Sequence, residues 1–130
     1  MRKLLTALLL ATLTLSLFSL TFTKEVLGAS NPKVSAYKTR NKRSVVVNFT
    51  SIQNLKSISY ELTYDSNKGP QGAGGTINLP KRKRRLSRSL LLGTCSHKVC
   101  TYHKDVKNIK LSVDFVLKSG GVVSYEKTIQ

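Results

Sequence analysis

The sequence predicts an all-β domain. In several segments hydrophobic and polar residues alternate with a period of two, and turn-forming residues separate these segments at short intervals. No window shows a sustained 3.6-residue hydrophobic period. The chain has 130 residues, of which 40% are hydrophobic, so it is long enough for one domain with a core. Because neither an internal repeat nor a long linker is visible, we expect a single domain over residues 30–130.

The alternation predicts seven strands. It is clearest in residues 44–51, where Val45, Val47 and Phe49 share one face, and strictest in residues 57–64. It is longest in residues 108–118. In chain order the expected strands cover residues 33–40, 44–51, 57–64, 76–79, 86–92, 108–118 and 122–129.

The expected connections follow from turn chemistry. Residues 65–75 contain Asp, Ser, Asn, Pro and four glycines, which predicts a loop. Residues 93–107 show no regular pattern and contain both cysteines, so an irregular segment is expected there. Residues 119–121 (SGG) are typical of a hairpin turn.

The number and spacing of the strands favour a seven-stranded antiparallel β-sandwich of the fibronectin type III-like or immunoglobulin-like kind. Each alternating strand hides only one face, so a second sheet has to cover it. In that order the strands would be A, B, C, C′, E, F and G. The side chains expected between the sheets are Val45, Val47, Phe49, Tyr60, Leu62, Leu111, Val113 and Phe115.

Four short stretches add a more specific likeness. They are residues 60–65 (YELTYD), 69–72 (GPQG), 93–96 (GTCS) and 99–103 (VCTYH). Together they resemble small secreted bacterial proteins of unassigned function with such a sandwich. The resemblance implies a compartment and a fold, and it implies no activity.

The N-terminus has the pattern of a targeting segment. Arg2 and Lys3 precede residues 4–23, which carry no charge and include nine leucines. A basic start followed by an apolar stretch is typical of a secretory signal, so we expect a helical signal peptide over residues 1–29. Cleavage is expected after Gly28 or Ala29. Twenty uncharged residues could also span a bilayer, so an uncleaved anchor is the alternative, and it would make residues 4–23 the only membrane contact.

The domain after this leader is strongly basic. The chain has 22 basic and 6 acidic residues, and Arg2, Lys3, Lys24 and Glu25 lie in the leader, which leaves residues 30–130 with a net charge of +14. The densest run is Lys81, Arg82, Lys83, Arg84 and Arg85, with Arg88 just beyond.

Three interpretations of this run stay open. One is a solvated, exposed loop on a basic protein. A second is attraction to a polyanion, such as an anionic surface polymer, an anionic lipid or extracellular nucleic acid. A third is proteolytic processing after Arg85, which would cut the domain between strands. Arginine favours phosphate or sulfate groups, which it binds through paired hydrogen bonds. No aromatic residue interrupts the run, so stacking on single-stranded bases has no evident platform.

Two cysteines and two histidines lie within nine residues: Cys95, His97, Cys100 and His103. An exported chain enters an oxidising compartment, which favours a Cys95–Cys100 disulfide. A zinc site made of all four residues is an alternative, but structural zinc sites usually join two ligand pairs across a longer segment. Free or redox-active thiols are a third reading.

No catalytic motif is evident, because nucleophile elbows, phosphate loops and paired carboxylates at a useful spacing are missing from the sequence. We therefore expect a non-catalytic module without a cofactor, secreted or at the cell surface, that acts in binding or structure. A polyanion binder using residues 81–85 and a metal-binding loop at residues 95–103 are the alternatives. The sequence names no partner.

The mass of the protein recovered from a secreting host tests the leader and the cysteines together. We expect the mass of a chain that begins at Ala29 or Ser30, because the signal pattern places cleavage there. The mass should also be about 2 Da below that of the reduced chain, since a disulfide forms with the loss of two hydrogens. Recovery of the full 130-residue mass would show an uncleaved anchor instead.

Overall fold

The structure is a computed structural model that describes residues 31–130. The expected signal helix and its boundary at residue 29 lie outside these residues. The described part contains nine β-strands and no helix, so it holds no helical segment that could cross a membrane. The prediction of an all-β fold is confirmed.

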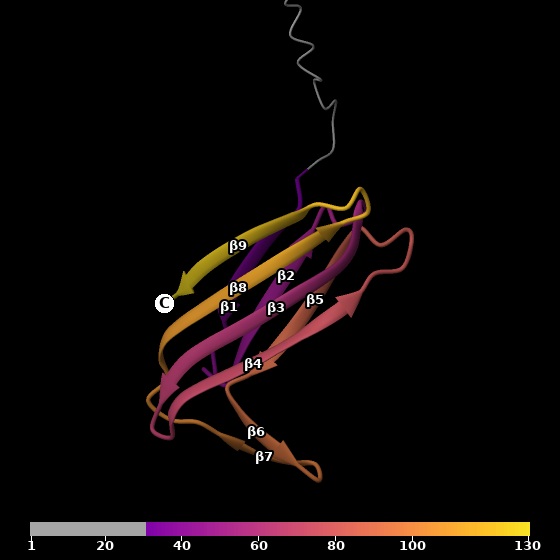
Figure 1. Cartoon of the computed structure of the whole chain (residues 1–130). Helices are drawn as coiled ribbons and strands as arrows, with labels where there is room; N and C mark the ends of the chain where they lie inside the picture. Colours follow the sequence, from indigo (N-terminus) through magenta and orange to yellow (C-terminus); the bar gives the residue numbers. More distant parts are fainter. Residues whose placement is uncertain (1–30) are drawn as a thin grey trace, which may run out of the picture.

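The strands form two main antiparallel sheets and one small hairpin. The first sheet has the order β1-β2-β5, with β1 at Lys33–Lys38, β2 at Ser44–Thr50 and β5 at Arg85–Leu91. The second has the order β4-β3-β8-β9. Its strands are β3 (Leu55–Ser66), β4 (Gly69–Asn78), β8 (Lys107–Leu117) and β9 (Val122–Ile129). The hairpin pairs β6 (Gly93–Ser96) with β7 (Val99–Tyr102) and projects from one end of the two layers (Figure 1).

The core lies between the two main sheets, as in a β-sandwich. Phe49 of β2 meets Phe115 of β8 edge to face, with ring centroids 6.2 Å apart, and Tyr60 of β3 at 6.5 Å. These are contacts between sheets, because β2 belongs to the first sheet and β3 and β8 to the second. The fully buried side chains are Val45, Val47, Phe49, Ile52, Leu55, Ile58, Leu62, Leu92, Ile109, Leu111, Val113 and Phe115.

The predicted core agrees with this arrangement except at its margin. Seven of the eight expected side chains are buried, and Tyr60 is half-buried against the same cluster. Asn48, on the opposite face of β2, stays partly exposed, so the register of β2 is the predicted one. Ile52 and Leu55 were not predicted as core, because they flank a turn and carry no alternation.

Two predicted connections are wrong. Residues 65–75 were expected to be a loop, but β3 continues to Ser66, and β4 starts at Gly69 and pairs with β3 along its whole length. Only the turn between them remains. Residues 93–107 were expected to be irregular, but they contain the β6–β7 hairpin. In both segments the strands are held by backbone hydrogen bonds and have no row of inward hydrophobic side chains. Hydrophobic alternation therefore could not predict them.

Replacing Phe49 should be the most informative test of the layered core. Phe49→Ala removes a fully buried ring that joins three strands, so we expect a loss of about 3–5 kcal/mol in the free energy of unfolding. Val46→Ala, on the half-exposed outer face of the same strand, is the matched control and should cost about 1 kcal/mol or less. Urea denaturation measures both, and similar costs for the two variants would contradict the layer assignment.

Candidate functional site

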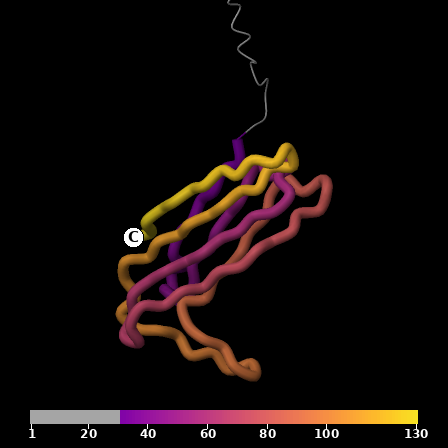
Figure 2. Tube along the Cα trace, viewed as in Figure 1, coloured from indigo at the N-terminus to yellow at the C-terminus, as the bar shows by residue number. Residues whose placement is uncertain are grey.

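The basic run lies at one end of the two-layer body. Leu79 donates its backbone N–H to the carbonyl of Lys56, and Ile52 donates to the carbonyl of Arg84. Lys118, in the β8–β9 turn, donates its backbone N–H to Asn54 and its ammonium to the Gln53 carbonyl at 2.7 Å. The β4–β5 loop, the β2–β3 connection and the β8–β9 turn therefore meet at one end, as Figure 2 shows.

Part of the run is held in place by backbone contacts. Lys83 donates its N–H to the Pro80 carbonyl, which closes a turn, and Arg84 accepts from Ile52. Arg85 begins β5 and pairs with Thr50 of β2. All five side chains of the run are exposed. The expectation of an exposed connection is confirmed, and its last two residues are tied to the first sheet.

An open groove at this end brings together four cations. It is lined by Lys33, Thr50, Ser51, Gln53, Arg82, Arg84 and Arg85. We call this set the cationic groove. Lys33 enters it because β1 begins opposite the last residue of β2, and Arg85 enters it because β5 begins opposite that same residue, Thr50. Thr50, Ser51 and Gln53 add hydroxyl and amide groups that can donate hydrogen bonds.

No carboxylate of residues 31–130 lines the groove. Asp114 and Glu126 lie on the outward side of the second sheet, where they accept hydrogen bonds from Ser124 and Ser112. Asp65 accepts from Asn108. Among residues 31–130 no ion pair joins these carboxylates to the lysines and arginines. The cations of the groove are therefore free to neutralise an external anion.

Sequence reasoning found only part of this site. It identified Arg82, Arg84 and Arg85 from their adjacency, but it missed Lys33, which is about 50 residues away in the chain. The signal was present: antiparallel pairing brings the start of one strand to the end of the next. Arg88, the sixth member of the expected set, lies further along β5 opposite Val47 and does not line the groove.

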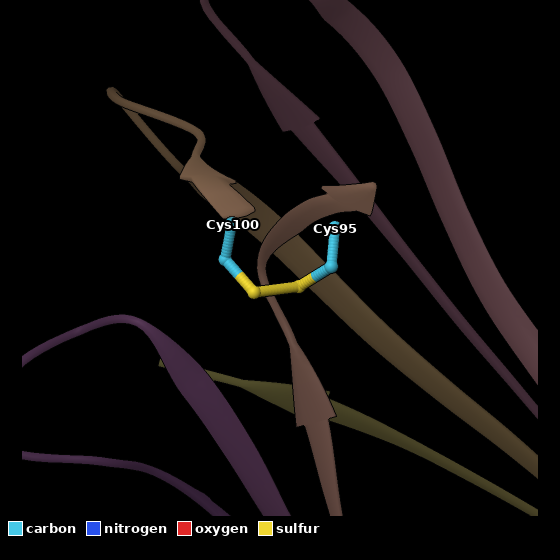
Figure 3. Close-up of a disulfide and its surroundings, with 2 residues drawn as sticks. All are labelled: Cys95 and Cys100. Carbon is cyan, nitrogen blue, oxygen red and sulfur yellow. A yellow bond between two sulfur atoms is a disulfide. The ribbon is translucent and has the colours of Figure 1, made fainter. Parts of the chain in front are cut away.

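The cysteines lie at the other end of the body. Cys95 and Cys100 are opposite one another in the β6–β7 hairpin and form a disulfide with an S–S length of 2.05 Å (Figure 3). Because both thiols are bonded, they are not thiolate ligands in this structure. Within residues 31–130 no cluster of three histidines, cysteines or carboxylates could hold a metal ion. The side chains of His97 and Ser96 share a hydrogen bond. Nδ1 of His103 shares a hydrogen bond of 3.1 Å with the Tyr64 hydroxyl.

The hairpin is anchored at its base and exposed beyond it. Leu92 donates its backbone N–H to the Arg43 carbonyl, and His103 donates its backbone N–H to the Leu92 carbonyl. The Arg43 guanidinium lies 4.6 Å from the centre of the Tyr102 ring.

Burial raises the pKa of Tyr64, which packs under this base. A Cβ on Gly93 would collide with the backbone of Thr101 and Tyr102, so only glycine fits where the hairpin begins. Val99 at the tip is 71% exposed.

Comparison with known proteins adds no assignment. No protein family, curated protein or solved structure matches the chain. The fold and the two ends of the molecule therefore carry the functional argument by themselves.

The disulfide should stabilise the hairpin and leave the body unaffected. β6 and β7 contribute no buried side chain, and the ring closed by Cys95 and Cys100 is short, worth about 2 kcal/mol in the chain-entropy model. In the variant Cys95→Ser/Cys100→Ser, we expect amide exchange to speed up in residues 93–102 while β2, β3 and β8 keep their protection. Equal loss of protection in all these strands would contradict a locally acting disulfide.

Proposed function

We propose that this chain is an exported, non-catalytic β-sandwich module that binds a phosphate- or sulfate-bearing polymer through the cationic groove. The observation that carries the proposal is the convergence of Lys33 with Arg82, Arg84 and Arg85 in one groove, which in the described part of the chain has no carboxylate in its lining. The strand pairing adds a cation from β1 to those of the basic run, so this groove concentrates more positive charge than the run alone.

The composition of the groove favours tetrahedral oxyanions. Three of its four cations are arginines, whose planar guanidinium groups hold phosphate or sulfate through paired hydrogen bonds. The groove contains no aromatic ring on which a base could stack, so the binding proposed here depends on the repeating charge of the polymer and not on base identity.

The strand order supports the proposed sandwich type. The proposed type requires strands A, B and E in one sheet and C′, C, F and G in the other, and the observed orders β1-β2-β5 and β4-β3-β8-β9 are compatible with it. In that order the B–C, C′–E and F–G loops meet at one end, and in this chain those connections surround the groove. Such modules commonly bind through loops at one end of a rigid scaffold.

Salt-dependent binding to heparin and to inorganic polyphosphate tests the proposal. We expect Arg82→Gln/Arg84→Gln/Arg85→Gln to weaken binding and to flatten the slope of log K against log salt by roughly 2 to 3, because each lost phosphate contact removes about 0.9 on duplex DNA. The matched control, Lys104→Gln/Lys107→Gln/Lys110→Gln, removes the same charge outside the groove and should change the slope little. Equal flattening by both triple variants would show attraction to net charge alone.

A second pair of variants separates the groove from the basic run. Lys33 and Lys38 occupy the two ends of β1, and only Lys33 lines the groove. We expect Lys33→Gln to lower the slope by about one contact and Lys38→Gln to leave it unchanged. If the two behave alike, the run binds without the groove.

A further inference from the structure

β9 is an edge strand with one free side. Among residues 31–130 it pairs with β8 only, so within the described part of the chain one row of its backbone N–H and C=O groups has no strand partner. Of the other three sheet edges, β4 contains Pro70 and four glycines, β5 carries Arg85 and Arg88, and β1 has only six residues. Proline, charge and short length are devices that protect an edge against pairing. β9 has eight residues with neither proline nor glycine, and its two charges, Glu126 and Lys127, are of opposite sign and leave the first four residues uncharged.

The inner face of β9 carries Val123, Tyr125, Lys127 and Ile129, and its first half is apolar and exposed. Val123 and Tyr125 lie opposite Phe115 and Val113, which are buried, yet they are 43% and 36% exposed. β9 comes close to β1 of the first sheet, but that approach does not cover Val123 and Tyr125. Alternation along β9 places Val123, Tyr125 and Ile129 on the inward face, but of these three only Ile129 is buried.

The alternation of ladder hydrogen bonds determines which residues of β9 face the open edge. At the β8–β9 turn, Leu117 donates its N–H to the Gly121 carbonyl, with Gly120 at φ 100°. Hydrogen-bonded and non-hydrogen-bonded pairs alternate from that point. The backbone groups of Val122, Ser124 and Glu126 therefore point away from β8.

We propose that two copies of this chain dimerise by antiparallel pairing of their β9 strands about a two-fold axis at Ser124. Ser124 then lies opposite its own equivalent, and Val122 lies opposite Glu126 of the second copy, both as hydrogen-bonded pairs. Val123 lies opposite Tyr125 of the second copy as the closer, non-hydrogen-bonded pair. Pairs of an aromatic and a β-branched side chain are among those that stabilise antiparallel strands, so this register uses the two exposed side chains together.

The local charge also favours a second copy at this edge. A protein with a net charge of +14 over residues 30–130 repels itself, but the middle of β3, β8 and β9 carries Glu61, Asp114 and Glu126 against Lys110 and Lys127. The proposed register also sets Glu126 opposite Val122 and not opposite its own equivalent. This inference does not depend on the proposed polymer binding, because the groove lies outside the pairing strand.

Sedimentation of the secreted protein with its native N-terminus tests the pairing. We expect a concentration-dependent dimer. Ser124→Pro removes an N–H that points to the open edge and should raise the dimer dissociation constant by roughly tenfold or more. Thr128→Pro is the matched control, because its N–H also faces the open edge but lies beyond the paired residues. Ser124→Ala keeps the N–H and loses only the hydroxyl bond to Asp114, so its dimer should persist.

Single cysteines test the register itself. Ser124→Cys should form a disulfide between copies under mild oxidation, because the two-fold axis brings this position next to itself, while Thr128→Cys should not. Circular dichroism of each variant checks that the strands remain folded. A wild-type protein that stays monomeric up to about 1 mM, or equal cross-linking at both positions, would overturn the proposal.

Discussion

The contact between Phe49 and the facing rings of Tyr60 and Phe115 holds the two sheets together. No helix in residues 31–130 can cover a sheet, so each main sheet loses its solvent-exposed apolar face only by packing on the other. Every other feature of the body depends on this packing. It sets the register of β2 against β5 and β1, and that register in turn brings Lys33, Thr50 and Arg85 to one end.

Sequence patterns predicted the strands that this core uses and failed for those that it does not use. The sequences of β2 and β8 alternate because one face of each strand is buried, so this burial can be predicted from the sequence. β4 has five glycines and alanines in its ten residues and is held by backbone pairing with β3, so its sequence shows no such alternation. The β6–β7 turn places His97 and Lys98 at positive φ, where hairpins usually have Asn or Gly, so its turn chemistry also gave no signal.

The candidate site was predictable to the extent that it is local. Five adjacent cations are visible in any reading of the chain, whereas the contribution of Lys33 depends on which strand ends meet. The exposure of one face of β9 likewise depends on how distant strands pack. Alternation shows that Val123 and Tyr125 share the face of Phe115, but their coverage depends on where the strands of the opposite sheet lie, and no local pattern encodes that placement.

The cationic groove lies at one tip of the body, so the two ends of the molecule are not equivalent. β1 starts at that tip, while β9 ends opposite the start of β8, beside the end that bears the disulfide hairpin (Figure 1). Two copies joined through antiparallel edges would aim their grooves in opposite directions. Such a pair could not bind one stretch of polymer with both grooves. It could bind two separate polymer molecules and so act as a cross-linker that gels or precipitates a polyanion at matched stoichiometry.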